Sequence, residues 1–212
     1  PEQAVTKIEE IVVQVGKTGT LTPVANLTPV LLAGTTVSRA TLHNFDEIRR
    51  KDIREGDHVV LQKAGEIIPQ VVSVLKEKRK GTEIPFTEPS TCPECKEKVV
   101  RYDTEVYLRC HNPYCHAQMK RRIRYFAGRD AMDIEGLGPA LVEQLVDKGF
   151  VKDYADIYYL RYEDLITLER MGEKSSSNLI QAIEAGKHRD LDRLICALGI
   201  LNVGSHTAEV LA

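Results

Sequence analysis

The sequence predicts a multidomain chain with three consecutive modules: a small β-barrel, a short cysteine-rich module and an all-α array. Three observations support this. Apolar residues alternate in short runs up to about residue 86, segment 87–116 concentrates cysteines but has few apolar residues, and from residue 117 onward apolar residues recur at helical spacing. We therefore expect domains at 1–86, 87–116 and 117–212.

The composition is that of ordinary packed domains. The chain has 212 residues, of which 42% are hydrophobic and 28% charged, and no uncharged apolar run approaches the roughly 18 residues that cross a bilayer. It begins at Pro1 with no leader-like segment, so we expect a cytoplasmic protein with no membrane partner. A net charge of −2 conceals two basic strips, residues 76–80 and 117–129.

The first module reads as five short strands and one helix. The expected strands and turns are residues 11–15, a turn at 16–19, 21–25, two proline-marked runs at 27–32 and 35–42, a helical patch at 45–49, a turn at 55–57, then 59–61 and 67–75. A short helix before the fourth strand is typical of an OB-fold barrel, which often binds nucleic acid. An SH3-like barrel fits the strand count nearly as well.

Four of the five cysteines in the second module have the spacing of a zinc site. They are Cys92, Cys95, Cys110 and Cys115, a C-x2-C pair followed by a C-x4-C pair. Thiolates suit Zn²⁺, and four of them leave no open coordination position, so the ion would be structural. The run 99–108 between the pairs has the valine and tyrosine content of two paired strands.

Other interpretations of the cysteines remain open. Two disulfides would be unusual in a reducing compartment, and His111 or His116 could replace one thiolate because each follows a ligand cysteine. Metal binding of about 10–16 kcal/mol would stabilise a segment too poor in apolar residues to fold by burial. Cys196 lies in an apolar run and reads as a small core residue.

The third module contains a repeat. Each copy has an apolar residue, two variable residues, a second apolar residue, a glycine and a later leucine, and the glycines Gly138, Gly172 and Gly204 are 34 and 32 residues apart. We interpret each copy as a helix-hairpin-helix element in which Leu137, Met171 and Val203 pin the two helices together. A tetratricopeptide-like array has a similar period but a different residue pattern.

The expected chemistry of each hairpin follows from its backbone. Unpaired N–H groups open the second helix, and a phosphate fits there without reference to base identity. Arg170 and Asn202 replace the first glycine in hairpins two and three, so the sequence predicts phosphate binding most directly for the first hairpin. The candidate contacts in the hairpins and the preceding basic strip are Gly136, Gly138, Gly172, Lys174, Gly204, Lys120, Arg121, Arg122 and Arg124.

The order of these modules, and several stretches within them, resemble the C-terminal half of bacterial NAD⁺-dependent DNA ligases. The resemblance covers essentially the whole chain. Its stretches are QVGKTG (14–19), LTPV (27–30), ATLHN (40–44), KAGEIIPQV (63–71), CPEC (92–95), AMDIEGLG (131–138) and LERMGEKS (168–175). Lys17 stands where the family more often has arginine, which keeps the charge but removes a bidentate contact.

The resemblance implies an enzyme that seals nicks in double-stranded DNA using NAD⁺ and Mg²⁺, with Zn²⁺ bound structurally. It also implies a bacterial protein that is associated with the nucleoid in the cytoplasm. No Lys-x-Asp-Gly segment, which carries the family's adenylated lysine, occurs in these residues. We therefore assign no catalytic residue here and expect a monomer with an adenylation domain upstream and a further hairpin and a BRCT domain downstream. In the barrel, Lys17 and Lys63 are candidate DNA contacts.

Two rival functions stay open. A stand-alone DNA-junction-binding protein also joins an OB barrel to helix-hairpin-helix elements, but without a zinc cluster between them. A protein-binding helical repeat would show no salt-dependent affinity for DNA.

Overall fold

The computed structural model describes residues 2–64, 68–102 and 105–212. It divides into two compact units, Pro1–Asn112 and Pro113–Ala212. The boundary lies within the predicted cysteine-rich module, so most of that module packs with the barrel.

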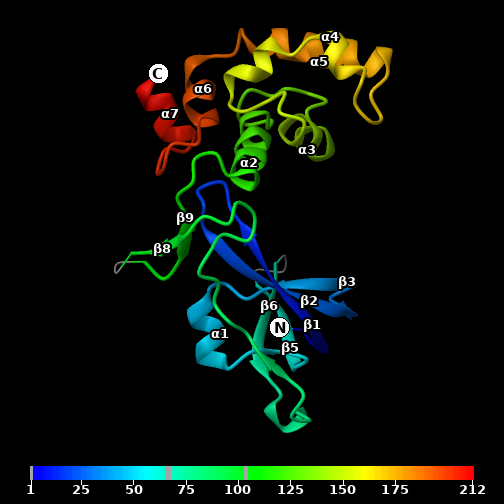
Figure 1. Ribbon diagram of the computed structural model, residues 1–212, viewed down its shortest axis with the longest axis vertical. Coiled ribbons are helices and arrows are strands. Elements are labelled where there is room, and N and C mark those ends of the chain that lie inside the picture. Colours follow the sequence, from blue (N-terminus) through cyan, green and yellow to red (C-terminus); the bar gives the residue numbers. More distant parts are fainter. Residues whose placement is uncertain (1, 65–67, 103–104) are drawn as a thin grey trace. The chain divides into compact units, whose positions relative to one another are not determined.

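Five strands close the barrel of the first unit in the order β1-β2-β3-β6-β5 (Figure 1). Their bounds are β1 (Gln3–Val15), β2 (Leu21–Leu32), β3 (Thr35–Thr41), β5 (His58–Ala64) and β6 (Ile68–Val74). Neighbouring strands are antiparallel except β3 and β6, which meet in parallel at Thr41 and Gln70. The helix α1 (Phe45–Lys51) precedes the fourth barrel strand, β5. The OB-fold prediction is confirmed, and the strand order excludes the SH3-like alternative.

The local sequence explains these elements. Alternate side chains such as Ile8, Leu21 and Leu61 are fully buried in the barrel, as period-two alternation requires. Asn44 caps α1, because its Oδ1 accepts a hydrogen bond of 2.9 Å from the amide of Glu47.

Two strand predictions need correction. The first strand, expected at 11–15, begins at Gln3. The separate runs expected at 21–25 and 27–32 form the single strand β2, whose pairing with β3 shifts register between Asn26 and Val30. Pro29 lies inside this irregularity, where its missing N–H disturbs no regular ladder bond. The last predicted strand corresponds to β6, and its first residue, Ile67, lies outside the described residues.

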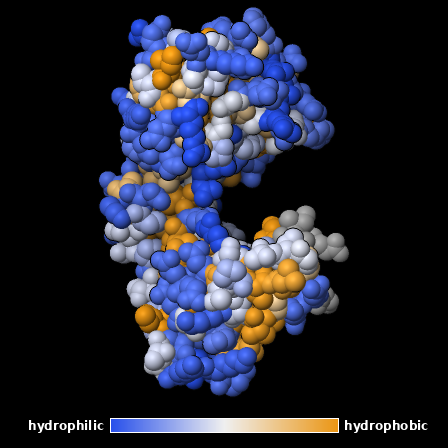
Figure 2. Space-filling model, turned by 90° about the vertical axis from the view of Figure 1, so that its right-hand side faces the viewer, coloured by the Kyte–Doolittle hydropathy of each residue, from blue (hydrophilic) through white to orange (hydrophobic). Residues whose placement is uncertain are grey.

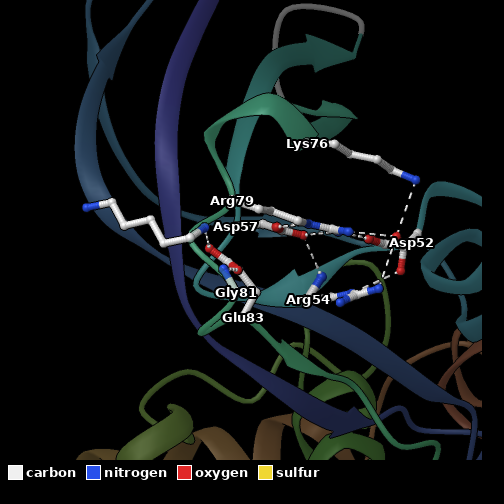
Figure 3. A network of polar contacts seen from close by, with 8 residues as sticks. Asp52, Arg54, Asp57, Lys76, Arg79, Gly81 and Glu83 are labelled. Carbon is white, nitrogen blue, oxygen red and sulfur yellow. Dashed lines mark hydrogen bonds and ion pairs between the residues drawn. The ribbon is translucent and has the colours of Figure 1, made fainter.

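A buried ionic network fastens the segment after β6 to the barrel (Figure 3). This segment contains the 3₁₀ turn η1 (Lys76–Lys78) and β7 (Ile84–Pro85), which pairs with β4 (Arg54–Glu55). Arg79 Nε donates to the fully buried carboxylate of Asp57 at 2.7 Å, and its Nη1 donates to Asp52 at 2.7 Å. Hydrogen bonds from Arg79 hold the pKa of Asp52 well below its usual range. The residues of the basic strip 76–80 therefore differ: Arg79 forms ion pairs within the protein, whereas Lys78 and Lys80 are exposed.

The remaining strands of the first unit form a small hairpin of β8 (Val99–Arg101) and β9 (Leu108–Cys110). Val99 pairs with Cys110, and Arg101 with Leu108. The predicted strand pair is confirmed, although residues 103 and 104 of the predicted run lie outside the described part of the chain.

The second unit is all-α, as predicted. Its elements are α2 (His116–Phe126), α3 (Pro139–Asp147), η2 (Ala155–Tyr159), α4 (Tyr162–Leu165), α5 (Glu173–Gly186), α6 (Leu191–Ala197) and α7 (Ser205–Leu211). Phe126, Leu145 and Leu179 are fully buried in one core. Cys196 is also buried, as expected of a small core residue.

The surface of the second unit, at the top of Figure 2, is largely hydrophilic, whereas the first unit shows broader apolar areas. Exposed apolar side chains on the barrel include Leu31 and Ile68, which are 68% and 57% exposed. Among the described residues, no helix has both the length and the apolar character needed to cross a bilayer.

Candidate metal centre and nucleic-acid interface

The first cysteine pair lies on a tight turn that aims both sulfurs to one side. The amide of Cys92 donates to the carbonyl of Glu97 at 2.8 Å, and the amide of Lys96 donates back to the carbonyl of Cys92 at 3.1 Å. Lys96 adopts a left-handed conformation with φ of 64° to close this turn.

The second pair comes from different elements. Cys110 ends β9, and Cys115 occupies the position before the first residue of α2. A thiolate at a helix N-terminus is stabilised by the helix dipole, which favours Cys115 as a metal ligand.

The four sulfurs gather at one point. The Sγ atoms of Cys92, Cys95, Cys110 and Cys115 all lie within 4.8 Å of one another, and those of Cys95 and Cys110 are 3.5 Å apart. Tetrahedral Zn²⁺ with Zn–S bonds of about 2.3 Å places sulfurs about 3.8 Å apart. The donor set and its spacing fit zinc, and with four thiolates the ion would have no position for water or substrate.

The alternatives for this cluster are not supported. None of the cysteines forms a disulfide. The ring of His111 packs edge-on against Tyr102, and His116 Nδ1 lies 3.7 Å from a carboxylate oxygen of Asp147. Neither histidine therefore belongs to the cluster that the structure assembles.

The thiols differ in how easily they ionise. Burial raises the pKa of Cys110 to about 12, so a metal-free thiol there would stay protonated. Burial also opposes ionisation of Cys95, but hydrogen bonds from the Glu97 amide and the Asn112 side chain lower its pKa to about 7. A bound divalent cation favours the thiolate at both positions.

The three glycines predicted in the repeat occupy the same structural position. Gly138, Gly172 and Gly204 each precede the first residue of a helix, α3, α5 and α7 respectively, with an extended backbone and no side-chain cap. All three are exposed, and an added Cβ would meet no atom within 4 Å. We call these positions the glycine turns.

The glycine turns also share their internal geometry. Two residues before each glycine, the backbone is left-handed, with φ of 90° at Gly136, 62° at Arg170 and 64° at Asn202. The next amide then donates to the carbonyl three residues earlier, at 3.3, 3.2 and 3.0 Å in the three copies. The sequence repeat is thus a structural repeat, although only the first copy keeps glycine at the left-handed position.

In the residues that the structure describes, amides in the first turn of the longer helices have no hydrogen-bond partner, as the geometry of a helix N-terminus requires. These amides belong to Ala140 and Leu141 in α3 and to Glu173 and Lys174 in α5. In the second copy the amide of Gly172 itself is satisfied by Ser175 Oγ at 2.9 Å. Of the residues expected to pin the hairpins, Leu137 is buried in the core and the half-buried Met171 packs against it. Val203 is half-buried.

The predicted basic residues differ in their availability. Lys120 forms ion pairs with Asp147 at 2.8 Å and Glu143 at 3.6 Å, and its side chain is only 24% exposed. Arg122 donates to Gln118, whereas Arg121 and Arg124 are exposed. Lys174 is exposed beside the second glycine turn.

One surface depression brings basic side chains to the first glycine turn. Arg124 and Arg129 line it together with Gly136, Gly138 and Pro139, and the acidic residues Asp133 and Glu135 line it as well. The sequence places Arg129 in the basic strip, but only the fold brings it to the turn. In the barrel, Lys17 lies in the turn between β1 and β2, and Lys63 donates to Thr35 Oγ1 at 2.7 Å.

Comparison with known proteins now agrees with this geometry. Residues 5–83 match the family model for the NAD-dependent DNA ligase OB-fold domain, and residues 91–117 match that for the NAD-dependent DNA ligase C4 zinc finger domain. The chain belongs to the NAD-dependent DNA ligase family. The resemblance stated from sequence and the structural zinc site are confirmed by these matches.

Similar curated proteins cover the whole chain. A DNA ligase of Pelotomaculum thermopropionicum is 60% identical over 212 residues, which are 100% of this chain and 31% of that protein. A DNA ligase of Halothermothrix orenii is 57% identical over 211 residues, 99% of this chain and 32% of that protein. The chain thus spans about a third of the length of the curated relatives that it matches.

Proposed function

We propose that this chain is the DNA-binding portion of a DNA ligase that uses NAD⁺ to seal nicks in duplex DNA during replication and repair. Its second unit would bind the duplex through helix-hairpin-helix elements that contact the sugar-phosphate backbone and ignore the bases. The observation that supports this most strongly is the glycine turn that occurs three times, with an exposed glycine in each copy and unpartnered first-turn amides in α3 and α5.

The chemistry of the first glycine turn suits a phosphate. The amides of Ala140 and Leu141 would donate to its oxygens, and the positive end of the α3 dipole adds to their effect. Arg124 and Arg129 supply charge at the same depression. Since these donors contact only the backbone, binding would not depend on sequence, as sealing nicks at any position requires.

The chemical steps of ligation would be performed by other parts of the enzyme. The family's adenylated lysine has no counterpart in these residues, so NAD⁺ and Mg²⁺ would bind mainly outside them. Within this portion, the four cysteines would hold Zn²⁺ as a structural ion that stabilises the β8–β9 hairpin.

The test is a binding titration of the chain with nicked and intact duplexes of unrelated sequence over a range of salt concentrations. We expect similar affinities for different sequences and a steep fall in affinity with salt, because phosphate contacts release counterions. A flat plot of log affinity against log salt would refute backbone binding. A strong preference for one sequence would refute the proposed indifference to bases.

A further inference from the structure

The zinc hairpin is attached directly to the turn between β1 and β2. The amide of Cys110, a predicted zinc ligand, donates to the carbonyl of Gly19 at 2.8 Å. The adjacent residue Arg109 forms an isolated antiparallel bridge with Thr20. The backbone that carries a metal ligand is therefore continuous, through hydrogen bonds, with the end of the barrel turn.

The side chain of Arg109 adds a second attachment to the same turn. Its Nη1 donates to Thr20 Oγ1 at 2.8 Å and lies 3.4 Å from Thr18 Oγ1, so one guanidinium spans both threonines. Glu105 holds the other side of this guanidinium through Nε at 2.6 Å. Arg109 is only 21% exposed in its side chain, which leaves it little freedom to leave the turn.

The turn itself is short and has few internal bonds. The amide of Gly16 donates to Thr20 at 2.8 Å, and the amide of Gly19 donates to Gly16 at 3.1 Å. Gly19 has φ of 80°, a conformation that glycine adopts freely but also leaves freely. The hydroxyls of Thr18 and Thr20 also lie 3.2 Å apart, and contacts from outside the turn add to these bonds in fixing its conformation.

The opposite side of the zinc hairpin is anchored to α1. Arg101 donates to Asp46 at 3.0 Å and to Glu88 at 2.8 Å. With one anchor on α1 and one on the β1–β2 turn, the hairpin has a fixed orientation on the barrel. Arg101 offers a matched control for Arg109, since both are arginines of the same hairpin but only Arg109 contacts the turn.

We infer that the zinc hairpin positions the β1–β2 turn, with Arg109 as the positioning residue, so that Lys17 is presented to the DNA backbone in one conformation. This inference rests on the proposed function and on the prediction from the sequence that Lys17 contacts DNA. Fixing the turn in advance lowers the entropy lost when a lysine is immobilised on a phosphate. Zinc thus supports a DNA contact on the barrel while touching no DNA itself.

The experiment uses the zinc-loaded chain and the variants Arg109→Ala, Thr20→Val and Arg101→Ala. Amide hydrogen exchange reports the turn directly, and zinc content shows that each variant keeps its metal. We expect the amides of Gly16 and Gly19 to exchange about fivefold faster in the first two variants, the effect of losing one hydrogen bond. In Arg101→Ala they should exchange as in the parent chain.

The second readout is the salt dependence of DNA binding, compared with Lys17→Gln. Loss of one phosphate contact lowers the slope of log affinity against log salt by about 0.9. Arg109→Ala should lower it to the same extent as Lys17→Gln, and the double variant should lower it no further.

These results separate the inference from the proposed function. Unchanged exchange at the turn in Arg109→Ala and Thr20→Val, or equal loosening in Arg101→Ala, would overturn the positioning role. Additive slopes would overturn it too, because Arg109 would then bind DNA by itself. If the turn loosens as expected but Lys17→Gln binds DNA normally, Arg109 positions the turn but the predicted DNA contact of Lys17 is wrong, and the proposed function of the second unit is unaffected.

Discussion

Replacing Gly138 by aspartate separates the role of the first glycine turn in binding from its role in folding. Gly138 has φ of −78° and ψ of 173°, which any residue adopts, and an added Cβ meets no atom within 4 Å. Aspartate is a preferred residue at this capping position and interacts favourably with the helix dipole. We expect Gly138→Asp to raise the free energy of unfolding by about 0.3–1 kcal/mol.

The same substitution should damage DNA binding. The new carboxylate would accept the α3 amides that we assign to a phosphate and would repel that phosphate. Loss of one hydrogen-bonded contact to a charged group is worth about 1.5–3 kcal/mol, or roughly a ten- to hundredfold loss of affinity. A variant that is more stable yet binds DNA more weakly cannot be explained by misfolding.

The assays are thermal unfolding and fluorescence anisotropy with a labelled nicked duplex at fixed salt. Gln181→Glu is the matched control, because it also makes the charge more negative by one unit at an exposed position of α5, more than two helical turns from the residue that starts that helix. We expect the control to bind nearly as well as the parent chain. If Gly138→Asp binds DNA within twofold of the control, the first glycine turn holds no phosphate.

Three further predictions concern Gly136, the zinc site and Asp52. Gly136→Ala should destabilise the second unit by about 1–2 kcal/mol in thermal unfolding, since φ there is 90°; unchanged stability would show that the turn can adopt another conformation. Metal analysis should find one zinc ion per chain. Removing the zinc with a chelator should increase amide hydrogen exchange in β8 and β9 while the amides of the barrel strands stay protected from exchange. Faster exchange in the barrel strands would contradict the prediction that zinc stabilises only the hairpin. Arg79 lowers the pKa of Asp52, so the stabilisation from this carboxylate is complete above the unfolded pKa of about 3.9 and is lost as the pH falls further. The free energy of unfolding of Asp52→Asn, measured in urea, should therefore depend less on pH below about pH 4 than that of the parent chain.

The sequence predicts those features that depend on local pattern. The spacing of Cys92, Cys95, Cys110 and Cys115 identified the metal site because ligand pairs on tight turns need only a few residues. The repeat of Gly138, Gly172 and Gly204 likewise located three helix starts, because each glycine is the residue directly before a helix and the apolar residues around it recur at the same local spacing.

Features that join distant segments escaped prediction. The pairing of Arg79 with Asp57, and of Lys120 with Asp147, links residues 22 and 27 positions apart and has no signal in either segment alone. Both residues lie in basic strips, so sequence reasoning counts them as charge available to DNA, whereas the fold neutralises them. Arg109 is likewise unremarkable in the sequence and acquires its contacts only when the zinc hairpin packs on the barrel.

The central claim is that backbone amides at the glycine turns bind the phosphates of duplex DNA. The most direct measurement is an NMR titration of the isotope-labelled chain with a nicked duplex, following the amides of Ala140, Leu141, Glu173 and Lys174. We predict large shift changes and slowed exchange at these amides, independent of the DNA sequence used. Saturation with DNA while these four amides keep their shifts and exchange rates would contradict the claim.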